Sequence, residues 1–446
     1  MPQASAALVT APSPPRVAGL RLALERLSVL GILVHAVFLP ISVAGMQIGL
    51  AVSLGALLAL RFSGRRVWAR SALDAPCVLL SAAAIVSLGL GALAGSPPVG
   101  WHEATLWRAI LTPILVVSAL EVVGGGPGGE REGAARRVAI WALALWAASS
   151  LVPSTIAWVQ YWTGFDPLHA LGLRAEAVRG VVPIYPDRYA AVGFFRWYQR
   201  LAHNLIPPIC VAAAVAVYGH VSARLRVLLA IAAAAGAAAV VFTLSRAAWV
   251  SLIAAGLLLA IVGGRARRWS IAGVVLASFA MLLHPGVQAR LRYLVTVRSA
   301  NDDRKAIWTV CRAVIADHPI TGVGWGNLPR RSLAYYDRLA PWSEMRAWCH
   351  DSFLSAWAEG GPLLFAALVA FWLLLLRAFW GKARAGDATG RAASAGAVAA
   401  LTAMLMNSLV HDILYSSEAM YGLGFALGIA AVLGRLTERG VASGTR

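Results

Sequence analysis

The feature that most constrains this chain is a series of apolar, almost uncharged runs, separated by short segments that contain charged residues, Gly or Pro. A run of about 20 such residues crosses the hydrocarbon core of a bilayer as a helix. The chain is 59% hydrophobic and 13% charged, whereas soluble domains carry about 25% charged residues. The sequence therefore predicts an all-α polytopic membrane protein. Twelve spans are expected, starting near residues 24, 45, 73, 105, 138, 201, 226, 247, 269, 352, 392 and 417.

The distribution of arginine predicts the orientation of these spans. Short cytoplasmic loops carry an excess of Lys and Arg. The turns around 41–46, 95–104 and 411–417 hold neither residue, whereas the alternate connections and both ends hold several. We therefore expect both termini in the cytoplasm. The net charge of +19 is spread over short clusters between apolar runs, which favours contacts with membrane lipids and argues against nucleic acid as a partner.

Two long, basic outer loops interrupt this regular pattern, and we expect the functional residues there. Long loops cross the membrane regardless of their charge, so these loops do not contradict the topology. The predicted parts are a cytoplasmic tail (1–23), spans 1–9 (24–283) with a loop at about 162–200, a large and mainly helical outer loop (284–351), spans 10–12 (352–436) and a second cytoplasmic tail (437–446).

The large outer loop contains a predicted amphipathic helix over residues 302–317, which Pro319 ends. Its apolar face consists of residues at three- and four-residue spacing, namely Ile307, Val310, Cys311 and Val314. One interpretation places the helix on the bilayer surface, with its basic residues toward the headgroups. In the other, Arg304 and Lys305 bind a diphosphate, whose paired oxygens fit the planar fork of an arginine. The segment "GVGWGN" (322–327) follows, and its glycines allow sharp turns or a close approach to a ligand.

The four cysteines fall into two pairs with different surroundings. Cys77 and Cys210 lie in apolar runs, whereas Cys311 and Cys349 lie in the large outer loop. A Cys311–Cys349 disulfide is one possibility if that loop is extracytoplasmic. Two free, partly buried thiols are the other.

A His-Asp pair stands where the large outer loop re-enters the membrane, in "RAWCHDSFLSAWAEGGPLLF" (346–365). The imidazole of His350, with an ordinary pKa near 6.5, suits proton transfer at neutral pH. Asp351 either orients His350 or caps the following helix. Glu359 lies inside the predicted span, where packing and a substrate contact are both open. Other histidines, for which we expect structural roles, are His35, His203, His318 and, in a second His-Asp pair, His411.

Taken together, four segments resemble the O-antigen ligase / O-antigen polymerase superfamily. They are "HPITGVGWGN" (318–327), "CHDSFLSAWAEGGPLLF" (349–365), "FTLSRAAWVSL" (242–252) and, more loosely, "VGFFRWYQRLAHNL" (192–205). The resemblance extends over about residues 190–430. It implies a glycan transferase of the bacterial inner membrane that works at the periplasmic face with an undecaprenyl-diphosphate-linked glycan as donor. The acceptor would be a hydroxyl of lipid A–core for a ligase, or of another glycan for a polymerase.

The implied chemistry assigns roles to particular residues. Displacing a diphosphate requires a base for the acceptor hydroxyl and cations for the leaving group. His350, with Asp351, is the candidate catalytic pair, and a purely structural hydrogen-bonding role is its alternative. For Arg246, at the end of a span, snorkelling to the headgroups is the alternative to diphosphate binding. The full set of candidate substrate-binding residues is Arg188, Arg246, Arg304, Lys305 and Glu359.

We expect neither a metal nor a cofactor, because no His/Cys/Asp cluster has the spacing of metal ligands and no sugar-nucleotide motif occurs in an outer loop. A non-enzymatic transporter of lipid-linked glycan is the alternative from another class of protein. Such a transporter would carry charged residues along a central cavity in several spans, whereas here the charges gather in two outer loops.

Overall fold

Helices occupy all of the predicted span positions. The computed structural model describes residues 15–96, 98–123, 129–175, 189–262, 267–296, 302–343, 346 and 348–436, and within them it contains helices and no sheet. A helix covers or directly follows each of the twelve predicted starts. These helices are α1 (Pro15–Phe38), α2 (Val43–Phe62), α3 (Asp74–Leu93), the 3₁₀ helix η1 (Leu106–Leu111) with α5 (Thr112–Glu121), α6 (Gly129–Thr163), α8 (Tyr198–Tyr218), α9 (Ala223–Phe242), α10 (Arg246–Val262), α11 (Arg267–Leu283), α16 (Ser352–Lys382), α17 (Ala388–Ser408) and α18 (Ser417–Leu433).

Fewer of these helices than the twelve predicted meet the length and composition needed to cross a membrane. Six do so among the described residues, namely α2, α3, α6, α8, α9 and α16. A seventh crossing results if α11 and α12 (Pro285–Thr296), which are bent by 72°, form one span. Helices α10 and α18 are apolar but only 17 residues long. The chain is therefore a multi-pass membrane protein with six or seven candidate spans.

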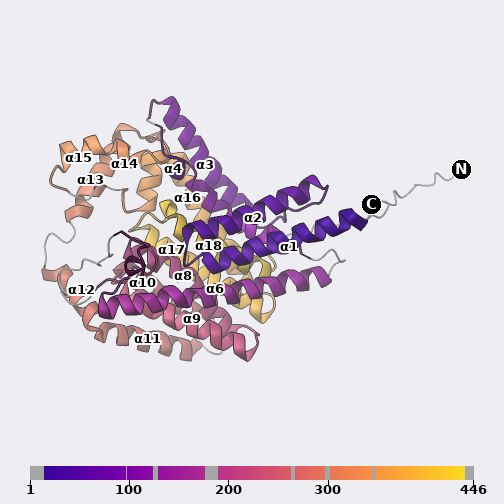
Figure 1. The fold of residues 1–446 in the computed structure, drawn as a ribbon. Coiled ribbons are helices and arrows are strands. Elements are labelled where there is room, and N and C mark those ends of the chain that lie inside the picture. Colours follow the sequence, from indigo (N-terminus) through magenta and orange to yellow (C-terminus); the bar gives the residue numbers. More distant parts are fainter. Residues whose placement is uncertain are drawn as a thin grey trace.

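The centre of the bundle is built on α8, α17 and α18, around which the other helices pack (Figure 1). Small residues allow these helices to approach closely, as is common where helices pack in lipid. A Cβ atom on Gly396 of α17 would lie 2.7 Å from the Cα atom of Val211 in α8. One on Gly428 of α18 would lie 2.6 Å from the side chain of Val116 in α5. The small side chains therefore decide which helices touch.

Ion pairs join the helix ends at one end of the bundle. Arg136 of α6 is paired with Asp387, the N-cap of α17, at 2.6 Å between Nη1 and Oδ2. Arg435, just past α18, is paired with Glu132 at 2.5 Å, and Lys382 Nζ donates to the carbonyl of Arg435 at 3.0 Å. Segments that are predicted to share the cytoplasmic side thus meet at the same end of the molecule.

The large outer loop forms a small helical unit at the end of the bundle opposite the start of α1 (Figure 1). The unit consists of α13 (Asp302–Asp317), α14 (Leu328–Arg331) and α15 (Leu333–Leu339), whereas α12, in the same loop, contacts α11. The bounds of α13 agree with the predicted helix, and the predicted apolar face is buried in a separate hydrophobic cluster with Tyr336 of α15. The predicted mainly helical character of this loop is confirmed for its described residues.

The helix α16 is broken at Gly361, and the segment 322–327, the glycine-rich loop, packs against this break. Gly361 has φ 60° and ψ −157°, which are not helical values, and Pro362 follows it. Because proline has no N–H, it cannot bond the carbonyl four residues earlier. That carbonyl belongs to Ala358, and it accepts a hydrogen bond from the N–H of Val323 at 2.9 Å. The loop thus satisfies a backbone group that the break leaves open.

The glycines of this loop are required by contacts with backbone inside the protein. A Cβ atom on Gly322 would lie 2.3 Å from the carbonyl carbon of Glu359, and one on Gly324 would lie 2.7 Å from the Cα atom of Gly91 in α3. The N–H of Gly324 also donates to the carbonyl of Glu359 at 2.8 Å. Glycines are therefore needed at these positions because residues 322–327 pack tightly against α3 and α16.

The break predicts a large effect for Gly361→Ala. A Cβ atom there would lie 1.9 Å from the carbonyl oxygen of Ile320, and the residue would be held at φ 60°. Strain and overlap together should lower the free energy of unfolding by about 2–4 kcal/mol. Thermal unfolding of the purified protein, followed by tryptophan fluorescence, measures this. Gly381→Ala in the same helix, where nothing lies within 4 Å, is the control. Equal unfolding temperatures for the two variants contradict the prediction.

Candidate functional site

His350 is held in a defined but uncommon backbone conformation directly before α16. Its φ of 50° lies in the left-handed region, which costs a side-chain-bearing residue about 1–3 kcal/mol. The N–H of His350 donates to Asp412 Oδ2 at 2.8 Å, and the N–H of Cys349 donates to Ser355 Oγ at 3.1 Å. These contacts fix the backbone at His350, whose side chain is 28% exposed.

Asp412 connects His350 to a distant part of the chain, the turn 409–416 between α17 and α18. Its Oδ1 atom accepts a hydrogen bond from Ser355 Oγ at 2.5 Å. Its Oδ2 atom lies 3.9 Å from His350 Nδ1, which is an ion-pair distance and not a hydrogen bond. Ser352 Oγ donates to the carbonyl of His411 at 3.0 Å. The turn is thereby attached to the first residues of α16.

Three histidine rings form a row that leads from the partly exposed His350 into the bundle. The ring centres of His350 and His411 are 6.2 Å apart, and those of His411 and His203 are 5.1 Å apart. His203 belongs to α8 and is 3% exposed. Its Nε2 atom has no hydrogen-bond partner within the described part of the chain. The row thus ends at a buried ring beside the side chain of Asn407 in α17.

Burial and two arginines lower the pKa values of histidines in this row and favour their neutral forms. Burial, followed by the charge of Arg304, lowers the pKa of His350 to about 4. Burial also lowers the pKa of His411 well below its usual value, and His203, Arg304, His350 and Arg246 lower it further. Burial raises the pKa of Asp412 to about 7, against the opposing effect of its hydrogen bonds. Since arginine keeps its charge at any ordinary pH, the cluster is cationic mainly through Arg246 and Arg304.

The structure brings some of the predicted substrate-binding residues together and separates others. Arg304 lies half-buried on α13, and Arg246 is the first residue of α10; both act on the histidine row. Lys305 is exposed on α13. Arg188 lies outside the described residues. The charges of both arginines therefore act on His411, and that of Arg304 also acts on His350.

The two predicted acids have positions that support the backbone. Asp351 caps α16, because its Oδ1 atom accepts hydrogen bonds from the N–H groups of Phe353 at 2.8 Å and Leu354 at 3.1 Å. Glu359 is completely buried. Its Oε2 and Oε1 atoms accept hydrogen bonds from the N–H groups of Gly326 at 2.9 Å and Leu328 at 3.0 Å. Of the roles that the sequence leaves open, these contacts correspond to capping for Asp351 and packing for Glu359.

A disulfide joins the segment of His350 to the helix of Arg304. Cys311 and Cys349 are bonded, with their Cα atoms 5.8 Å apart, whereas Cys77 and Cys210 are buried free thiols. Cys311 lies about two helical turns after Arg304 on α13, and Cys349 directly precedes His350. Of the two alternatives for this cysteine pair, a disulfide or two free thiols, the structure contains the disulfide.

Loss of this disulfide is expected to loosen the small helical unit. Replacing both Cys311 and Cys349 by Ser should lower its free energy of unfolding by about 2–4 kcal/mol, because the open loop gains conformational entropy when it unfolds. Limited proteolysis of residues 302–343, with and without a reductant, measures the change. Cys210→Ala, at a free thiol in α8, is the control and should leave the cleavage rate unchanged. Mass spectrometry that finds both cysteines alkylated without reduction contradicts the prediction.

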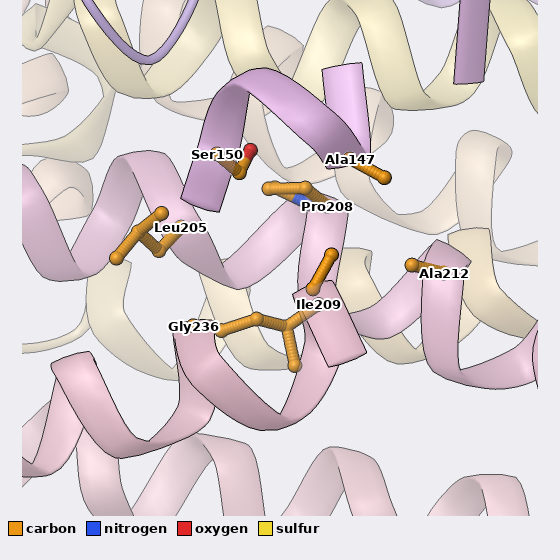
Figure 2. Close-up of a pocket in the computed structure, with 8 residues that line it drawn as sticks. Ala147, Ser150, Leu205, Pro208, Ile209, Ala212 and Gly236 are labelled. Atoms are coloured by element: carbon orange, nitrogen blue, oxygen red, sulfur yellow. The ribbon is translucent and has the colours of Figure 1, made fainter. Parts of the chain in front are cut away.

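Other parts of the described chain offer no second site of comparable chemistry. No group of three or more His, Cys, Asp or Glu residues is arranged to hold a metal ion among the residues searched. Figure 2 shows a cavity of about 10 Å³ between α6, α8 and α9, enough for about one water molecule. It is lined by Ala147, Ser150, Leu205, Pro208, Ile209, Ala212, Ala232 and Gly236. This cavity is too small and too apolar to bind a glycan or a diphosphate.

The sequence motifs did not single out Asp412, and they favoured structural roles for His203 and His411, two other members of the cluster. These residues reach His350 only through the packing of α8, α17 and α18. The signal that could have found them is the repetition of a His-Asp pair, at 350–351 and 411–412, at the same predicted side of the membrane.

Comparison with known proteins supports the resemblance seen in the motifs. Residues 230–369 match a family model described as O-antigen ligase. No curated protein matches the chain. The matched region includes Arg246, Arg304 and His350, whereas His203 and His411 lie outside it. Residues 230–369 of this chain are therefore similar to an O-antigen ligase domain.

Proposed function

We propose that this protein is an O-antigen ligase-like glycosyltransferase. It moves a glycan from an undecaprenyl-diphosphate carrier to a hydroxyl of lipid A–core at the periplasmic face of the bacterial inner membrane. The observation that supports this most is that His350 lies beside His411 and Asp412 and that the charges of Arg246 and Arg304 act on this group of residues. Twelve crossings, with both termini in the cytoplasm, belong to the same proposal.

In the proposed reaction His350 acts as the base. A neutral imidazole accepts a proton, and the lowered pKa keeps His350 neutral at pH 7 in the free protein. Nδ1 of His350 faces Asp412, so Nε2 is the atom that takes the proton of the acceptor hydroxyl. Asp412 is a positioning residue, because it holds the backbone of His350 and favours the imidazolium that forms.

The arginines stabilise the leaving group in the same step. The acceptor oxygen forms a bond to the anomeric carbon while the bond from that carbon to the diphosphate oxygen breaks. The diphosphate leaves with the bonding electron pair, so negative charge grows on it. Arg246 and Arg304, and also Arg188 and Lys305 in their predicted roles, bind that charge. No step requires a metal or a cofactor.

A polymerase is the second candidate, since it uses the same donor and differs only in its acceptor, another glycan. The family match covers both activities. A ligase mutant would lose all capped lipopolysaccharide, whereas a polymerase mutant would retain caps of a single repeat.

The test is glycan transfer by the purified full-length protein in lipid nanodiscs. The donor is an undecaprenyl-diphosphate-linked glycan, and lipid A–core and a second glycan are supplied as acceptors in separate reactions. We expect a lipid A–core product that forms equally well in the presence of EDTA. If a product forms only with the glycan acceptor, the protein is a polymerase and not a ligase. If folded protein binds the donor and yields neither product, the enzymatic proposal fails and the transporter of lipid-linked glycan takes its place.

A further inference from the structure

His411 stands at the centre of the cationic cluster, although the family match ends before it. It lies in the turn 409–416, whose backbone is attached to α16 on both sides of the ring. The carbonyl of His411 accepts a hydrogen bond from Ser352 Oγ at 3.0 Å, and the N–H of Leu414 donates to the same Ser352 Oγ at 3.4 Å. The ring therefore has a fixed place in the cluster.

The groups that face His411 are basic and come from several elements, while the nearby acids are already engaged. Asp412 receives hydrogen bonds from Ser355 and from the backbone of His350, and Glu418 of α18 is paired with Arg200 at 2.7 Å. The ring centres of His203 (α8) and His350 lie 5.1 and 6.2 Å from that of His411, and the charges of Arg246 (α10) and Arg304 (α13) act on the same ring. Two arginine charges that act on one ring, beside carboxylates that are already hydrogen-bonded or paired, are typical of an anion site.

We propose that His411 binds the diphosphate of the lipid carrier and takes up a proton when it does so. This inference rests on the proposed function, because it adds a residue to the same site. A protonated imidazole has two N–H donors. One donates to a phosphate oxygen, and the other lies in a cluster that includes the ring of His203, 5.1 Å away between ring centres. The proton comes from solvent on binding and returns to solvent when the diphosphate product leaves.

The physical reason for this coupling is a reversal of the local charge. In the free protein, burial and the surrounding basic groups disfavour the charged form of His411. A bound diphosphate brings negative charge into the cluster and favours that form. Proton binding and diphosphate binding therefore strengthen each other by the same factor. Arg246 and Arg304 cannot produce this coupling, because they keep their protons throughout.

The experiment measures the protons taken up per bound diphosphate. Full-length protein in nanodiscs is titrated with farnesyl diphosphate by calorimetry at pH 7, in buffers that differ in their heat of ionisation. We expect the wild type to take up close to one more proton than His411→Gln. The variant should also bind about 10- to 100-fold more weakly, as for a lost hydrogen bond between charged groups. His220→Gln, beyond the other end of α8, is the matched control and should equal the wild type.

A second variant keeps the test decisive. In His411→Arg the charge is permanent, so farnesyl diphosphate should bind without the extra proton uptake. If His411→Gln does not fold, the comparison is made between the wild type and His411→Arg. Equal proton uptake by the wild type and His411→Gln overturns the inference, as does an extra proton that disappears only in His350→Gln. Those outcomes leave glycan transfer by the wild type untouched, whereas absence of transfer removes the proposed function instead.

Discussion

Replacing His350 by alanine is expected to reduce the turnover number for glycan transfer by about 10²- to 10⁴-fold, the usual contribution of a general base. The donor should still bind, because Arg246 and Arg304 remain in place. The measurement is kcat and KM for transfer to lipid A–core with protein in nanodiscs. His318→Ala, in the same outer loop, is the control. Transfer by His350→Ala within about threefold of that control contradicts the role of His350 as base.

The lowered pKa of His350 gives this prediction a pH dependence. Burial and Arg304 move the pKa to about 4, and the neutral imidazole above that pH is the form that accepts a proton. In His411→Gln, where donor binding takes up no extra proton, kcat/KM reports the free enzyme and should stay level between about pH 7 and 5 and fall as the pH drops through about 4. In the wild type, proton uptake by His411 should add a rise in kcat/KM toward lower pH above that fall. A midpoint near the ordinary histidine value of about 6.5 means that another group limits the reaction.

Replacing Glu359 by alanine is expected to destabilise the protein by about 2–6 kcal/mol, because two buried N–H groups lose their acceptor and each costs about 1–3 kcal/mol. The groups belong to Gly326 and Leu328, at the end of the glycine-rich loop. Glu359→Gln retains one acceptor oxygen and should have an intermediate effect. Thermal unfolding and proteolysis near residues 322–328 measure the loss.

The control for Glu359 is Asp337→Ala, in the same outer unit. Asp337 is exposed and paired with Arg346 at 2.8 Å, and an exposed pair of this kind contributes less than about 1 kcal/mol. If Glu359→Ala unfolds at the same temperature as Asp337→Ala, the two hydrogen bonds to Glu359 do not stabilise the loop. If Glu359→Ala is instead fully stable but no longer transfers glycan, Glu359 contacts the substrate.

Helix positions could be predicted from the sequence because they depend on local patterns. The apolar runs located the helices, and the three- and four-residue spacing located the buried face of α13. The number of crossings could not be predicted in the same way. Helices α10 and α18 are apolar yet only 17 residues long, and α11 and α12 meet at 72°, so an apolar run is a weaker indicator of a complete crossing than of a helix.

The candidate site was only partly predictable, since its members meet through tertiary packing. His350 and Arg304 stood out because they lie in a polar loop beside a recognisable motif. Asp412 lies 62 residues after His350 and bonds its backbone, a contact that no local spacing indicates. For Glu359 the position was predicted, but its hydrogen-bond partners depend on how the glycine-rich loop folds onto α16.

The break in α16 has a consequence for exchanging parts between related proteins. The carbonyl of Ala358, which Pro362 leaves open, is completed by Val323, and Gly361 makes room for Ile320. A graft that moves residues 320–328 alone carries one half of this junction into a host that lacks the other. A graft that moves residues 320–328 together with 358–362 carries the complete junction. The two segments are separated along the chain, but their contacts make them one exchangeable piece.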